Sequence, residues 1–230
     1  MTARSRRNLS VTTLALLLLL LLLLPAIGES TRAPAAAAPR FQGTAEPIGP
    51  ELRQRMTGVS WHQGCPVGFE RLQLLRVTHW GFDGEVHRGR LVVHRDSAQS
   101  MLRTMRQLYR LRFPIRRMRL VDAYGADDRR SMAADNTSAF NCRTVAGTSR
   151  WSEHAYGHAI DVNPVENPYV TSDGYVSPPA GARHTDRSQR APGLIHRRGP
   201  VVAAFEENGW AWGGNWSWPK DYQHFSVGGD

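Results

Sequence analysis

The spacing of apolar residues predicts a hairpin followed by a helix in the first half of the chain. Residues 71–80 and 85–94 alternate loosely between apolar and polar positions, and a Gly-Phe-Asp-Gly turn signal separates them. Over residues 96–112 apolar side chains recur at intervals of three and four, which predicts an amphipathic helix. Pro114 ends this pattern.

In the second half of the chain, the pattern of apolar and polar residues predicts shorter elements. They are a buried strand over 118–123, a loop over 124–131, a strand over 158–162, a long loop over 167–198, a helix over 201–208 and a strand pair over 210–225. Strands and helices that do not alternate regularly are typical of the α+β class. We therefore predict a small, mostly antiparallel sheet with flanking helices.

The N-terminal region differs from the rest in composition. Three arginines precede an apolar run that includes nine leucines, Leu16 to Leu24, so residues 1–28 are predicted to be a signal peptide or an N-terminal membrane anchor. Residues 29–58 are rich in Ala, Pro and Gly, which indicates a linker. The folded domain is expected over 59–230, secreted or membrane-anchored on the extracytoplasmic side of the cell envelope.

The net charge of +9 comes almost entirely from arginine, because Lys220 is the only lysine among 29 basic residues. A positive field favours anionic partners, such as a cell wall or a membrane surface. The arginines are scattered and no nucleic-acid motif accompanies them, so no nucleic-acid partner is expected. We expect the protein to be a monomer.

Two cysteines, Cys65 and Cys142, suit an exported protein with one disulfide. A bridge across so long a loop contributes about 4 kcal/mol in the chain-entropy model. The alternative is a catalytic thiol, but neither cysteine has the local sequence of a cysteine protease.

The candidate chemistry lies in two motifs, Ser-Glu-His-Ala-Tyr-Gly-His-Ala-Ile-Asp over 152–161 and Asp-Tyr-Gln-His over 221–224. Imidazole nitrogens and a carboxylate oxygen are typical zinc ligands, and a catalytic zinc site uses three protein ligands with an open fourth position. His154, Asp161 and His224 form such a set. Asp221, three residues before His224, is placed to act as general base and then to protonate the leaving amine.

Other residues of the first motif have simpler interpretations. His158 follows His154 by four residues, as in a helical metal pair, but Gly157 and the β-prone residues after it argue against a helix. We therefore interpret His158 as a non-ligand. Ser152 is interpreted as a local hydrogen-bonding or substrate-binding residue rather than a nucleophile.

The motifs resemble those of the VanY-like zinc D-alanyl-D-alanine carboxypeptidases and L-alanyl-D-glutamate endopeptidases of bacterial walls and phage lysins. Their signature is S-x-H-x-x-G-x-A-x-D, followed far downstream by a carboxylate and x-x-H, and every fixed position is present here. The resemblance covers residues 120–227. It implies a hedgehog/DD-peptidase-like fold with a zinc cleft, with His154, Asp161 and His224 as ligands and Asp221 as the base.

Two further assignments follow from the resemblance. Relatives often carry an arginine, thought to stabilise the developing oxyanion, at the position that Gly125 occupies here. Arg143 is the candidate replacement, with a plain surface arginine as the alternative. Trp212 and Trp216 precede the second motif in a sequence similar to the endopeptidase branch, and they either wall the substrate groove or belong to the core.

The sequence thus predicts a zinc metallopeptidase that hydrolyses a bond of the peptidoglycan stem peptide. The L-Ala-D-Glu endopeptidase type is favoured, and a D-Ala-D-Ala carboxypeptidase is the alternative. A wall-binding module with a structural zinc is the rival from another class, although structural zinc needs four closed ligands.

Overall fold

The computed structural model describes residues 39–229, so the predicted signal or anchor segment 1–28 lies outside the described residues. Within 39–229, no helix has the length and apolar character needed to cross a membrane. The helices are α2 (Pro50–Met56), α3 (Ala98–Arg110), α4 (Asp128–Ala133), α5 (Glu153–Tyr156) and α6 (Pro200–Glu206). The 3₁₀ turns are η2 (Phe69–Arg71), η3 (Arg95–Ser97), η4 (Val121–Tyr124), η5 (Pro179–His184) and η6 (Gly213–Asn215).

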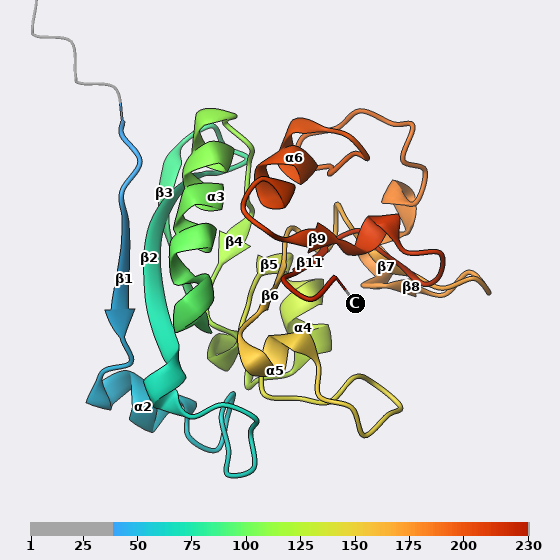
Figure 1. Cartoon of the computed structure of the whole chain (residues 1–230). Coiled ribbons are helices and arrows are strands. Elements are labelled where there is room, and N and C mark those ends of the chain that lie inside the picture. The colour runs from blue at the N-terminus through green and yellow to red at the C-terminus, as the bar shows by residue number, and fades with distance from the viewer. Residues whose placement is uncertain (1–38, 230) are drawn as a thin grey trace, which may run out of the picture. The chain divides into compact units, whose positions relative to one another are not determined.

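An antiparallel sheet of three strands forms one side of the molecule (Figure 1). Its strands are β1 (Gly43–Pro47), β2 (Leu72–Trp80) and β3 (Val86–His94), in the order β1-β2-β3. The predicted hairpin of β2 and β3 is confirmed. β1 and α2 lie in the stretch predicted as linker, and β1 pairs with β2 along its whole length, so this part of the stretch is folded.

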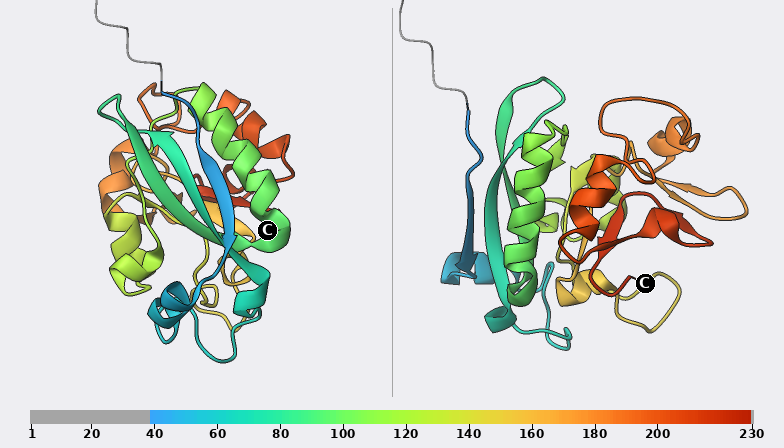
Figure 2. Two further views of the ribbon diagram at one scale, coloured as in Figure 1. Left: turned by 90° about the vertical axis from the view of Figure 1, so that its left-hand side faces the viewer. Right: turned by 45° about the horizontal axis from the view of Figure 1, so that its top comes forward.

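Helix α3 packs on this sheet (Figure 2). It carries the predicted apolar face. Its buried residues are Ala98, Met101, Thr104, Met105, Leu108 and Tyr109. The helix begins two residues later than expected, because the chain first makes the 3₁₀ turn η3.

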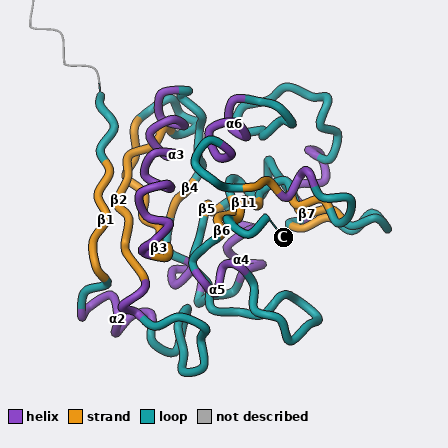
Figure 3. The backbone as a smooth tube through the Cα atoms, in the orientation of Figure 1, coloured by secondary structure: helices purple, strands orange, loops and turns teal. Residues whose placement is uncertain are grey.

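The second half of the chain forms small sheets from distant segments (Figure 3). One sheet has the order β6 (Ala159–Asp161), β11 (His224–Ser226), β9 (Ala211–Trp212), and another has the order β10 (Lys220–Asp221), β7 (Tyr169–Val170), β8 (Val176–Ser177). β4 (Arg117–Met118) and β5 (Asn136–Thr137) form a parallel pair. Every other strand pair within residues 39–229 is antiparallel, so the predicted α+β class with mostly antiparallel sheets is confirmed.

Three local predictions are wrong. The buried strand expected over 118–123 is limited to β4, and η4 follows it. The loop expected over 124–131 contains the start of α4, because Asp127 caps this helix by accepting the N–H of Arg130 at 3.0 Å. The long loop expected over 167–198 also contains regular structure, namely β7, β8 and η5.

The main core joins the two halves of the chain. It includes Leu75 and Val93 of the first sheet, the buried face of α3, Ile160 of β6 and Phe225 of β11. A second cluster gathers under α2 and contains Cys142, whose predicted disulfide with Cys65 is present, with the two Cα atoms 5.9 Å apart.

A buried carboxyl pair lies where the 163–168 segment meets the end of α4. Asp135 and Glu166 are 5% and 3% exposed, and Arg116 contacts both carboxylates at 3.3 Å. Burial, together with the neighbouring Asp135, raises the pKa of Glu166 to about 7. The charged form of Glu166 is therefore disfavoured in the folded protein.

This pair predicts a specific pH dependence of stability. The pKa of Glu166 is higher in the folded than in the unfolded chain. Its contribution to the free energy of unfolding is therefore fully present below pH 4.5 and is lost as the pH rises through about 7. Glu166→Gln cannot ionise, so its free energy of unfolding should exceed that of the wild type by about 1–3 kcal/mol at pH 8. Denaturant unfolding at pH 5 and pH 8 measures this, and an equal difference at both values would contradict it.

Candidate metal centre and its surroundings

His154 is held on a single helical turn, α5, although the residues from Gly157 onward argue in the sequence against a helix here. Ser152 caps this turn, because its Oγ accepts the N–H of His154 at 3.3 Å. Gly157 ends it in the left-handed conformation at φ +75°. The carbonyl of Gly157 then accepts the N–H of His94 at 2.8 Å, which attaches the turn to β3.

Asp161 and His224 come from neighbouring strands and are direct partners across them. β6 and β11 pair antiparallel with Asp161 opposite His224. Directly opposed residues of an antiparallel pair point to the same face of the sheet, so both side chains reach one point. The predicted strand after Gly157 is thus confirmed as β6.

The structure brings the three predicted ligands together in the protein interior. His154, Asp161 and His224 are 3%, 5% and 6% exposed. His154 Nε2 lies 3.3 Å from His224 Nδ1 and 3.3 Å from Asp161 Oδ2, and His224 Nδ1 lies 3.2 Å from Asp161 Oδ1. Neighbouring donors of a tetrahedral zinc with bonds of 2.0–2.1 Å lie about 3.3 Å apart, so the three residues fit this ion.

The hydrogen bond made by His154 supports the same geometry. His154 Nδ1 donates to the carbonyl of Ala139 at 2.6 Å, which leaves the Nε2 lone pair directed at the other two donors. His224 presents Nδ1, and its Nε2 is buried with no hydrogen-bond partner among the described residues.

The charges in the cluster compensate one another. Burial opposes ionisation of Asp161, but the two imidazoles outweigh it and hold the pKa of this carboxyl far below its usual range. Burial likewise lowers the pKa of His154, but the neighbouring Asp161 reverses the shift and the net pKa is raised. Asp161 is therefore the fixed negative charge that a cation at this point would neutralise.

Asp221 lies on β10, three residues before His224. Its Oδ1 is buried without a hydrogen-bond partner among the described residues. Burial raises the pKa of Asp221 to about 6, and the charge of Asp161 adds to this shift. Such a carboxylate ionises just below neutral pH, as a general base requires.

Arg143 is held in place by an acidic residue that the sequence analysis missed. Its guanidinium contacts Asp128 of α4 at 2.9 Å, and both side chains are 29% exposed. Both charges act on the pKa of His154, which Arg143 lowers and Asp128 raises. The Nε of Arg143 is buried with no partner among the described residues. The Asp-Asp sequence at 127–128 is a recognisable helix start, but the pairing across 15 residues has no sequence signal.

The three residues predicted to bind substrate lie in three different environments. Trp212 is 3% exposed and its ring stacks near Phe225, so it belongs to the core and is not free to contact substrate. Trp216 is half-buried, with its ring centre 5.4 Å from that of His224. Ser152 is 6% exposed and caps α5, which is the local hydrogen-bonding role that the sequence analysis offered for it.

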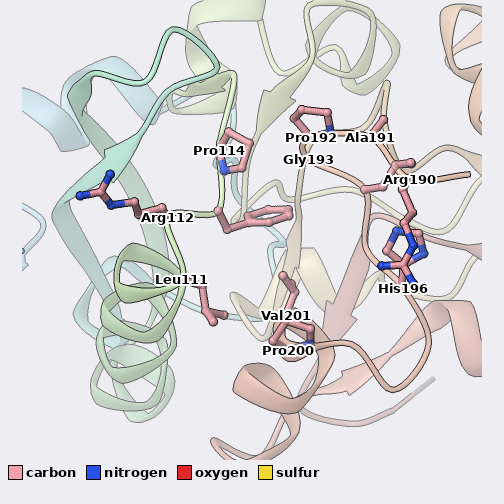
Figure 4. Close-up of a pocket in the computed structure, with 12 residues that line it drawn as sticks. Leu111, Arg112, Pro114, Arg190, Ala191, Pro192, Gly193, His196, Pro200 and Val201 are labelled. Carbon is pink, nitrogen blue, oxygen red and sulfur yellow. The ribbon is translucent and has the colours of Figure 1, made fainter.

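Two other features of the described residues are separate from this centre. His62, Cys65 and Cys142 lie close enough to share an ion, but the two sulfurs form the disulfide. A pocket of about 480 Å³ lies between the end of α3 and the segment before α6 (Figure 4), and none of the three donors lines it. Residues that line it include Leu111, Arg112, Pro114, Arg190, His196 and Val201.

The comparison with protein families gives a match at this centre. Residues 146–227 match the model of a family described as D-alanyl-D-alanine carboxypeptidase. The matched segment contains all three donors and Asp221, so the resemblance stated from the motifs is confirmed there, and the match supports a peptidase. Arg143 and Asp128 lie outside it. Searches of curated proteins and of solved structures gave no match.

The position of Gly157 generates a stability prediction. A Cβ at this residue would lie 2.5 Å from the backbone nitrogen of His94, in addition to the left-handed φ. Gly157→Ala should therefore lower the free energy of unfolding by about 3 kcal/mol or more, against about 1 kcal/mol for the backbone conformation alone.

Gly174→Ala is the matched control, since its φ is +89° and no atom lies within 4 Å of the added Cβ. Chemical denaturation of the two variants tests the comparison. Equal losses of stability would show that the contact with β3 is not the cause.

Proposed function

We propose that the protein is a zinc-dependent peptidase that hydrolyses a peptide bond in the peptidoglycan stem. The observation that carries this proposal is the set of three buried donors with tetrahedral spacing, together with the half-buried carboxylate of Asp221, whose pKa is raised. The family match at residues 146–227 supports the same class of reaction. The Cys65–Cys142 disulfide supports an extracytoplasmic location, secreted or anchored to the membrane.

His154 Nε2, His224 Nδ1 and Asp161 would hold the ion. Zinc supplies Lewis-acid activation of water and of the scissile carbonyl when bound. Ala139 fixes the orientation of His154 through its carbonyl, and strand pairing fixes the other two donors. Three donors leave one position open for substrate or water, whereas a purely structural zinc would need a fourth protein ligand.

The other residues have roles that follow from their charge and position. Asp221 takes a proton from the attacking water and then delivers it to the leaving amine. Arg143 offers a guanidinium toward the negative charge that develops on the carbonyl oxygen. Trp216, whose ring lies beside His224, contacts the substrate near the scissile bond.

Two bonds of the stem peptide compete as the target. We favour the L-Ala-D-Glu bond, on the resemblance of the tryptophan-rich segment to the endopeptidase branch. The family description names the D-Ala-D-Ala bond instead, which makes the carboxypeptidase the second candidate. The wall-binding module is disfavoured by Asp221, because a module that only binds has no use for a half-buried carboxylate in this position.

Mass spectrometry of purified muropeptides incubated with the domain tests the proposal. The wild type should release product only without a zinc chelator, and the product identifies the bond. Asp221→Asn should retain zinc but lose at least about 100-fold in turnover, because general-base catalysis contributes about 10²–10⁴. Near-normal turnover by this variant would exclude Asp221 as the base, and no cleavage by the zinc-loaded wild type would sink the proposal.

Zinc content tests the donor set independently. His224→Ala removes one of three ligands, so the purified variant should contain well under one zinc per chain when analysed by elemental mass spectrometry. His158→Ala is the control, since His158 hydrogen-bonds Ser97 at 2.8 Å and is no member of the donor cluster. Stoichiometric zinc in the first variant, or its loss in the second, would overturn the assignment.

A further inference from the structure

A groove of about 370 Å³ lies beside the candidate metal centre, between the end of α6, η6 and the C-terminal residues. Small-molecule sites in proteins start at about 300 Å³, so the groove has room for one or two sugar rings. Residues that line it include Glu206, Ala211, Asn215, Trp216, Val227 and Gly228.

The lining combines an aromatic ring with hydrogen-bonding groups. Trp216 supplies an indole and Val227 is 46% exposed, while Glu206 and Asn215 supply a carboxylate and an amide. A sugar presents C–H groups to an aromatic face and hydroxyl or amide groups to polar neighbours, so this mixture suits a saccharide. The carboxylate of Glu206 disfavours an anionic ligand and favours a neutral one.

The groove shares a wall with the metal centre. The ring of Trp216 lies 5.4 Å from that of His224. At Gly213 of η6, an added Cβ would lie 2.7 Å from the carbonyl oxygen of Asp221 and 3.3 Å from Cβ of His224. η6 therefore lies directly against the catalytic segment, while its last residue, Asn215, faces the groove.

The groove is also held in shape by contacts outside the metal centre. Asn215 Oδ1 accepts a hydrogen bond from Arg197 Nε at 3.1 Å. Trp216 Nε1 donates to the carbonyl of Gly229 at 3.2 Å, and Lys220 Nζ contacts the carbonyl of Trp216. A ligand would thus meet residues that are already oriented, which reduces the entropy lost on binding.

We propose that this groove binds a neutral N-acetylated sugar of the glycan strand to which the stem peptide is attached. The inference rests on the proposed function and specifies its substrate as glycan-linked peptide. It also bears on the bond that is cut. An extended residue spans about 3.5 Å, so the first stem bond lies about one residue from the sugar and the D-Ala-D-Ala bond about 14 Å away. A groove that shares Trp216 with the metal centre matches the first bond.

Matched substrates test this proposal, namely a disaccharide-pentapeptide and the same pentapeptide without sugar. The wild type should cut the glycan-linked form with a kcat/KM about tenfold higher, because binding energy from a remote part of the substrate is used at the reacting bond. Ala211→Phe fills the groove from an exposed position. The variant should lower kcat/KM for the glycan-linked substrate to the value for the free peptide. Its kcat/KM for the free peptide should stay within about twofold of the wild-type value.

Zinc content and thermal unfolding of Ala211→Phe check that the variant is folded, and Glu206→Gln is a second variant that keeps the shape of the groove. Equal kcat/KM for both substrates would overturn the sugar site while the peptidase stands. A loss on the free peptide as large as on the glycan-linked one would assign the groove to peptide instead, and would also overturn it.

If the wild type cleaves neither substrate, the proposed function is contradicted. A separate binding measurement then tests whether the groove binds the sugar. NMR titration with the peptide-free disaccharide should shift the indole resonance of Trp216 in the wild type and not in Ala211→Phe. The absence of a shift in the wild type would overturn the sugar site.

Discussion

The antiparallel pairing of β6 with β11 is the constraint on which the metal centre depends. It sets Asp161 opposite His224 and thereby fixes two donors that are 63 residues apart in the chain. A slip of one residue would turn one of the two side chains to the opposite face of the sheet. The buried Phe225, stacked on Phe205 of α6 at 3.7 Å, opposes such a slip because it would have to leave the core.

The remaining parts of the centre are held to this pair from other directions. Ser152 and Gly157 confine His154 to one helical turn, and the carbonyl of Ala139 orients its ring. Asp128 holds the guanidinium of Arg143 in an ion pair. The centre therefore combines one rigid element, the strand pair, with short segments that carry single functional groups, which is typical of sites that are preorganised for catalysis.

Much of this centre was predictable because its information is local. The first ligand motif and the strand after Gly157 lie within ten residues, and the helix α3 is long and strongly periodic. The role of Trp212 was not predictable, since an aromatic residue in a core and one in a groove have the same sequence. The Asp128–Arg143 pair and the pairing of β1 with β2 depend on contacts between distant segments, which composition does not reveal.

The attachment of Gly157 to β3 has a consequence for how this architecture can be divided. Residues 146–227 contain all three donors and coincide with the family match, so they look like a portable unit. However, the turn that carries His154 is hydrogen-bonded through Gly157 to the backbone of His94, and α3 and the first sheet complete the core of the segment. The segment is thus no module that could be grafted onto another scaffold. Its loops can vary in evolution or design, but the segment requires the hairpin of β2 and β3 to be present.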